Sequence, residues 1–156
     1  MRNRELIRQI QIIESLFNKT STFVSELELQ SHWAKYICIL CSGLLENAIE
    51  LIYLDYIEQS SSNKRIKRFA SNYVSRVQNV NATKMIEIAG YFDRTWAEKL
   101  KDYLAKEGRK EAIDTIIKNR HDIAHGRTST ITVSRLKDYF DKSIRVLEFI
   151  EKQCAQ

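Results

Sequence analysis

Proline is absent from this 156-residue chain, and glycine occurs only four times. Sandwiches, barrels and doubly wound sheets need both residue types repeatedly, because hairpins and tight βα turns depend on their backbone conformations. A chain so poor in turn residues is therefore predicted to be all-helical. Since 44% of its residues are hydrophobic, it has enough apolar side chains for one core. We expect residues 1–156 to form a single domain.

The sequence lacks the patterns of a membrane span and of an export signal. Its longest uninterrupted apolar stretch, residues 36–41, is far shorter than the ~20 residues that cross a bilayer. The first residues carry a charge or an amide every two or three positions, unlike the apolar centre of a signal peptide. The cysteines are odd in number, Cys38, Cys41 and Cys154, which argues against a disulfide framework. We expect a cytoplasmic protein with reduced thiols and no membrane association.

Apolar residues recur at the i, i+3/i+4, i+7 spacing of amphipathic helices. The segment 26–59 is apolar on more than one face in its middle, which predicts a buried central helix. The polar run 59–63 predicts a loop. We expect the other helices at about 2–19, at 66–77, from Asn81 or Thr83, for a turn or two at 96–104, at 112–123 up to Gly126, and after the loop 128–132. Aromatic residues at helical spacing are interpreted as core: Phe69, Tyr73, Tyr91, Phe92, Tyr139 and Phe140.

The net charge of +5 comes from one segment. Residues 59–86 contain six lysines and arginines and no Asp or Glu, and four of these cations lie within residues 64–68. Such a cluster, with no carboxylate nearby in the sequence, favours a phosphate-bearing partner. A solvated basic helix face is the alternative interpretation.

The segment 119–127, NRHDIAHGR, is the richest in side chains that can do chemistry. His125 is predicted at the end of its helix, where the macrodipole favours a protonated imidazole. Arg120 precedes it by five residues, and its long side chain could reach the same anion. An arginine that stabilises a phosphorane and a histidine that moves a proton are groups that a metal-free ribonuclease needs. A helix end carrying dipole-complementing Arg and His is the alternative.

Arg120-x4-His125, with a polar residue after the arginine and Ala-His-Gly before a final helix, resembles the Arg-x(4–6)-His signature of the HEPN superfamily. It most resembles the RiboL-PSP-type branch, whose central helix is similar to the segments 33–36 and 42–47. The resemblance implies a compact up-and-down helical bundle with one long central helix. It also implies a homodimer that brings two motifs together, and metal-independent RNA cleavage by a toxin or an anti-phage defence effector.

On this resemblance Arg120 and His125 are the catalytic pair, and His121 supports them together with Asp122 and Asn119. Glu46, a carboxylate beside apolar neighbours, is expected to orient Arg120 or His121, unless it faces solvent. RNA is the expected substrate, without a cofactor or a metal, and an antitoxin or a defence-complex protein is a further expected partner. The expected RNA-binding residues are Lys64, Arg65, Lys67, Arg68, Arg76, Lys118 and Arg127.

Other interpretations stay open. His121 and His125 could chelate one ion from a shared helix face, but a zincin needs Glu after its first His. An HD-type metal phosphohydrolase needs further ligands, and the remaining histidine is His32. Cys38-x-x-Cys41 has the spacing of a redox or zinc motif, but its apolar surroundings favour two buried small hydrophobes. A catalytically silent HEPN-like subunit that binds RNA, a nucleotide or a protein is the alternative to an enzyme.

Overall fold

The computed structural model describes residues 1–20 and 27–155, and within them the secondary structure is entirely helical. Residue 26, where the second helix was predicted to begin, lies outside the described part. The prediction of an all-helical protein with one long central helix is confirmed. The helices are α1 (Arg4–Lys19), α2 (Leu27–Ser60), α3 (Lys64–Val74), α4 (Ala82–Phe92), α5 (Arg94–Leu104), α6 (Arg109–Ala124) and α7 (Val133–Cys154).

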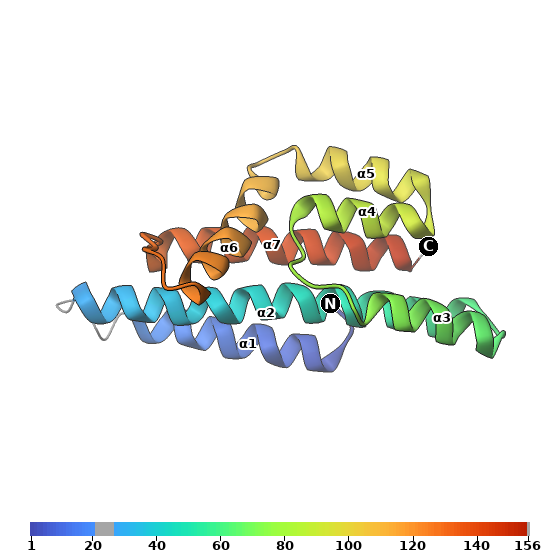
Figure 1. Ribbon diagram of the computed structural model, residues 1–156, viewed down its shortest axis with the longest axis horizontal. Helices are drawn as coiled ribbons and strands as arrows, with labels where there is room; N and C mark the ends of the chain where they lie inside the picture. Colours follow the sequence, from blue (N-terminus) through green and yellow to red (C-terminus); the bar gives the residue numbers. More distant parts are fainter. Residues whose placement is uncertain (21–26, 156) are drawn as a thin grey trace.

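Helix α2 is the centre of the bundle and packs against α1, α3, α6 and α7. In Figure 1, α1 and α3 run antiparallel to α2, whereas α7 follows its direction. Two adjacent positions are buried in each successive turn of α2, at Leu44 and Leu45, at 48–49, and at 52–53. A helix with so wide a buried face needs neighbours on several sides, and the other helices supply them.

Helix α2 is also long and apolar enough, by length and composition, to cross a membrane. In the structure 56% of its most apolar 18-residue window is buried inside the bundle. It therefore behaves here as the core helix of the fold.

Helices α4 and α5 form a hairpin whose two members share one capping residue. Asp93 ends α4, and its side chain accepts hydrogen bonds from the backbone N–H of Thr95 (2.6 Å) and Trp96 (3.3 Å) at the start of α5. Because of this cap, α5 is three turns long, not the one or two predicted from the apolar residues alone. The amide of Gln153 donates to the carbonyl of Trp96 (3.2 Å) and joins α5 to α7.

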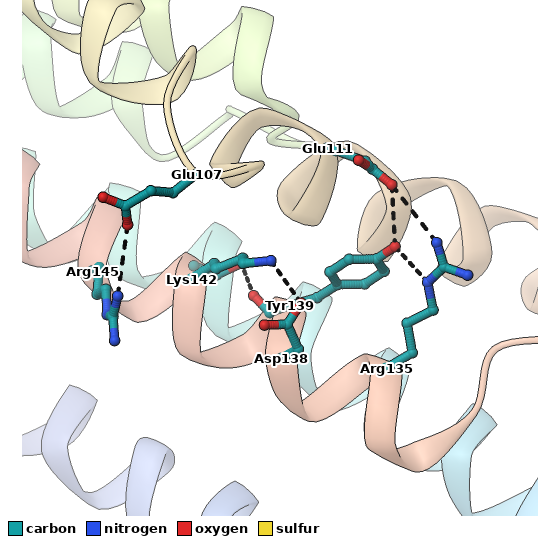
Figure 2. A network of polar contacts seen from close by, with 8 residues as sticks. Glu107, Glu111, Arg135, Asp138, Tyr139, Lys142 and Arg145 are labelled. Carbon is teal, nitrogen blue, oxygen red and sulfur yellow. Dashed lines mark hydrogen bonds and ion pairs between the residues drawn. The ribbon is translucent and has the colours of Figure 1, made fainter.

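The first half of α6 is held on α7 by polar contacts that Figure 2 shows. Arg135 donates through Nε to the hydroxyl of Tyr139 (2.8 Å), which donates to Glu111 (3.3 Å). Just before α6, Glu107 pairs with Arg145 (3.7 Å). These contacts fix where α6 begins, and hence where its far end lies.

Three details of the sequence prediction are wrong around α3. Helix α2 continues through Ser60 while Ile57 is still buried, so the loop is shorter than 59–63 and Asn63 caps α3. Helix α3 ends at Val74, so position 77 lies beyond it. Three of the aromatic residues interpreted as core are exposed: Phe69, Tyr73 and Tyr91.

The exposure of these aromatics follows from the packing of α3. Among the residues of α3, only Val74 is buried, because α3 meets α2 through one narrow face. Tyr139 and Phe140 are buried as predicted. Phe92 is half-buried and its ring stacks on Tyr53 with centroids 4.8 Å apart.

Candidate active site at the end of helix α6

Gly126 ends α6 in the left-handed conformation, with φ +68°. Its N–H donates to the carbonyl of Ile123 (3.1 Å), and the N–H of Arg127 donates to the carbonyl of Asp122 (2.8 Å). This pair of bonds is the Schellman motif, which strongly favours glycine at this position. The predicted helix end at Gly126 is thereby confirmed, and the backbone of His125 is held at the last turn.

His121 and His125 lie on one face of α6, one turn apart. Their ring centroids are 4.3 Å apart with an interplanar angle of 56°, and both side chains are exposed. Two imidazoles in contact at a helix C-terminus can accept, hold and return a proton at a bound anion. The structure therefore brings the two histidines together as the sequence predicted.

Arg120 does not share that face. Five residues along an α-helix correspond to a rotation of about 140°, and Arg120 is half-buried. Its guanidinium makes no hydrogen bond or ion pair with any residue that the structure describes. Such a guanidinium is available to a phosphate, but the helical spacing places Arg120 on a different side of α6 from His125.

Asp122 and Arg127 neutralise each other beside the histidines. Their side chains form an ion pair, with Oδ1 and Nη1 3.5 Å apart. The side chain of Arg127 is largely exposed and that of Asp122 is mostly covered. Arg127 is therefore a weaker candidate for a phosphate contact than its charge alone suggested.

The side chain of Asn119 is hydrogen-bonded to the loop that follows α6. Its Nδ2 donates to the carbonyl of Thr115 (2.9 Å), and its Oδ1 accepts from the hydroxyl of Ser129 (2.7 Å). Ser129 is buried, although it belongs to a Thr/Ser run that has the composition of an ordinary polar loop. Asn119 thus holds Ser129 and the loop after α6, a contact that the sequence pattern did not reveal.

Glu46 orients neither Arg120 nor His121, contrary to the prediction. Its Oε1 accepts a hydrogen bond from the backbone N–H of Asn79 (2.7 Å). Asn79 has a positive φ of 54°, a conformation that is uncommon for residues other than glycine. Glu46 therefore holds the connection between α3 and α4. Glu46 and Asn79 are too far apart in the sequence for a local pattern to predict this contact.

That connection and α6 enclose a hollow of about 340 Å³ next to His121. Lys118 of α6, one of the residues expected to bind RNA, contributes a cation to its wall. A polar hollow beside two imidazoles is a place where part of a ligand could be seated. Its lining consists of Asn79, Asn81, Thr83, Asp114, Ile117, Lys118 and His121.

The other potential ligands and nucleophiles lie apart from this site or are buried. Across residues 1–20 and 27–155, no group of three or more His, Cys, Asp or Glu side chains is placed to hold a metal ion. His32 faces Glu28 on α2 at 3.9 Å. Burial raises the pKa of the Cys38 thiol to about 12, and it raises the pKa of Cys41 well above its usual value. Burial therefore favours the protonated form of both thiols over the reactive thiolate.

The lysines and arginines on and near α3 differ in their contacts, although they look equivalent in the sequence. Lys67 pairs with Glu58 of α2 at 2.7 Å, and Lys84 pairs with Glu87 at 2.9 Å. Two lysines of the segment 59–86, which contains no Asp or Glu, therefore pair with carboxylates after all. The fold places Glu58 and Glu87, which flank the segment in the sequence, beside them. Lys64, Arg65, Arg68 and Arg76 are exposed. In Figure 1 the start of α3 and the C-terminal end of α6 lie toward opposite ends of the molecule, so this cluster and the histidines form separate surfaces.

The structure is thus all-helical over the residues that it describes, and two touching histidines lie at the C-terminal end of α6, with Arg120 one residue before His121. The family model described as RiboL-PSP-HEPN matches residues 4–156. The chain therefore belongs to the RiboL-PSP-HEPN family, as its motif and long central helix indicated. No curated protein and no solved structure matches the chain significantly.

Proposed function

We propose that this protein is a metal-independent endoribonuclease that uses Arg120 and His125 and acts as a toxin or an anti-phage defence effector. The observation that carries the proposal is the end of α6. There two touching imidazoles stand exposed, next to the half-buried Arg120, which makes no ion pair with the described residues, in a member of a HEPN-type family. Proteins of this type are often ribonucleases, and the side chains present are those that the chemistry needs.

In the proposed reaction His125 takes the proton of an RNA 2′-hydroxyl, and the resulting oxygen attacks the adjacent phosphorus. The bond to the 5′-oxygen breaks, and that oxygen takes a proton from an imidazolium. The products are a 2′,3′-cyclic phosphate and a 5′-hydroxyl. Arg120 would stabilise the negative charge that develops on the phosphorane oxygens.

The rotation of about 140° between Arg120 and His125 is why we propose a homodimer. A single α6 directs the two side chains apart, whereas two copies related by a two-fold axis can direct the arginine of one and the histidine of the other into one groove. The active site would then be composite, with both motifs facing the same RNA.

The first test is substitution of each member of the pair. We expect Arg120→Ala and His125→Ala each to reduce RNA cleavage by ~10²–10⁴-fold, the usual cost of removing a proton-transfer or charge-stabilising group. The helical circular dichroism spectrum should be unchanged, because neither side chain is buried. Matched controls are His32→Ala and Arg94→Ala, which replace exposed residues of the same types on α2 and α5. Full activity in either test variant would disprove the assignment.

A second arm of this test separates the proposal from an HD-type metal phosphohydrolase. Cleavage should persist in excess EDTA, because Arg120 supplies the positive charge that a metal would otherwise provide. Elemental analysis of the active protein should find no stoichiometric zinc, manganese or iron. EDTA-sensitive turnover together with a bound transition metal would favour the metal hydrolase.

A catalytically silent HEPN-like subunit is the second candidate, and one observation favours it. Within one chain the helical spacing places Arg120 and His125 about 140° apart around α6, so on this view a protein that does not dimerise through α6 would have no complete site. Such a protein would bind RNA, a nucleotide or a partner protein without turnover. RNA binding without any cleavage, unaltered by His125→Ala, would support this alternative.

A further inference from the structure

Phe69, Tyr73 and Tyr91 form an exposed surface, which we name the aromatic face. Their side chains are 77%, 42% and 60% exposed, respectively. Phe69 and Tyr73 are four residues apart on α3 and so share one side of that helix. The rings of Tyr73 and Tyr91 meet edge to face with centroids 5.4 Å apart, which joins α3 to the end of α4. Large apolar rings this exposed and this close together usually mark a binding surface.

The aromatic face borders two hollows. One, of about 420 Å³, is lined by all three rings together with Ala70, Val74 and Phe92. The other, of about 710 Å³, is also lined by Phe69 and Tyr73 and includes Arg76 and Lys84. Both volumes are in the range of sites that hold small organic groups. Flat groups could therefore lie against these residues in either hollow.

The surroundings of the aromatic face are cationic. Arg76 is exposed at the second hollow, and Lys64, Arg65 and Arg68 are exposed on the same helix as Phe69. One carboxylate is close: Glu87 accepts a hydrogen bond from the hydroxyl of Tyr91. It is also paired with Lys84 at 2.9 Å and 3.0 Å, so its charge is neutralised. The face is thus suited to a partner that carries flat rings and negative charge.

We propose that the aromatic face stacks the bases of single-stranded RNA, while Arg76 and the exposed cations of α3 bind its phosphates. Stacking on aromatic rings within a basic surface is how proteins hold single strands without reading their sequence. A duplex offers no free base faces to such a platform. This inference rests on the proposed function for RNA as the ligand class.

The aromatic face lies away from the histidines. In Figure 1, α3 and the end of α4 lie toward the opposite end of the molecule from the C-terminal end of α6. A base stacked on the face is therefore not the base next to the cleaved bond. The face should raise the affinity for RNAs long enough to reach both places, and it should leave the cleavage step unchanged.

The same surface could instead receive an acidic, apolar protein segment, and Ile66, which is 58% exposed on α3, would suit one. Three exposed rings beside arginines favour RNA, because rings add stacking to apolar burial. Substitutions can separate the two. Phe69→Leu keeps an apolar side chain and removes the ring face, whereas Phe69→Tyr and Tyr73→Phe keep the ring.

The experiment measures binding of a fluorescently labelled single-stranded RNA and of the matching duplex, with His125→Ala as the background so that the RNA stays intact. We expect Phe69→Ala, Tyr73→Ala and Tyr91→Ala each to weaken single-strand binding by about 5- to 150-fold for each base that no longer stacks. Phe69→Leu should behave like Phe69→Ala, and the ring-keeping variants like the parent. Tyr36→Ala, at a 49%-exposed tyrosine of α2, is the matched control and should have no effect.

In the cleaving protein, the same substitutions should raise KM for long RNA and leave kcat unchanged. Thermal melting confirms that each variant is folded, which is expected since the three rings are exposed. Unchanged RNA binding in the triple alanine variant, or full binding by Phe69→Leu, would overturn the inference and leave the face to a protein partner. If the parent binds single strands through these rings but never cleaves, only the proposed catalysis fails.

Discussion

Gly43 and Gly126 sit in open space, since a Cβ added at either would meet no atom within 4 Å. They differ in backbone conformation. Gly43 lies inside α2, whereas Gly126 has φ +68° at the end of α6. Alanine at Gly126 would therefore be strained, and alanine at Gly43 would be relaxed and would lower the entropy of the unfolded chain.

We expect Gly126→Ala to lower the free energy of unfolding by about 1 kcal/mol, and Gly43→Ala to raise it by about 0.5–1 kcal/mol. Urea denaturation followed by circular dichroism measures both. The two substitutions add the same methyl group, so each is the control for the other. Shifts of the same sign would contradict the assignment of Gly126 as the residue that ends α6.

Helix α3 has one narrow buried face and otherwise exposes cations and rings. Lys67 is paired with Glu58 and is mostly covered, whereas Lys64, Arg65 and Arg68 are exposed. Four cations that look equivalent in the sequence are thus of two kinds. Only the exposed kind can release counterions from an RNA backbone without first breaking an ion pair within the protein.

Replacing Lys64, Arg65 and Arg68 with Gln should weaken RNA binding to a similar extent for all sequences. The slope of log affinity against log salt should flatten by roughly 0.7 for each phosphate of a single strand that the variant no longer neutralises. Lys67→Gln, one position from the exposed Arg68, is the comparison and should change the slope less. Cleavage at saturating RNA should persist in both. An unchanged slope in the triple variant would mean that α3 is a solvated face or binds a protein.

The packing of α6 in the bundle determines where one chain places its two histidines and Arg120. Ion pairs of Glu107 and Glu111 hold the start of α6 on α7. The position of the C-terminal end of α6, which carries the histidines, is thereby fixed relative to the bundle. Its histidines are presented on one side and Arg120 on another. In the proposed mechanism, a second copy would complete the site.

We expect the protein to be a two-fold dimer in solution at micromolar concentration, as measured by light scattering. Specific activity should fall when the enzyme is diluted below the dissociation constant of the dimer, because a single chain would lack a complete site. A protein that is monomeric and keeps its specific activity at every dilution would show that Arg120 and His125 act within one chain.

Local signals in the sequence were enough for the all-helical fold class, the long central helix and the end of α6. The absence of proline and the apolar periodicity predicted an all-helical fold with α2 at its centre, because periodicity reports which residues share a side of a helix. Gly126 marked the end of α6, since a left-handed backbone is a property of the residue itself. The apolar surroundings of Cys38 and Cys41 also predicted their burial, because those neighbours lie on the same helix.

The partners of these residues depended on contacts between segments far apart in the chain. Glu46 bonds Asn79, and Asn119 holds Ser129, but neither spacing has a local signature. Phe69 and Tyr91 had the helical spacing of core residues and are exposed, because an apolar stripe is buried only where another element covers it. Periodicity says which side of a helix is apolar, and only packing determines whether that side meets a helix, solvent or a ligand.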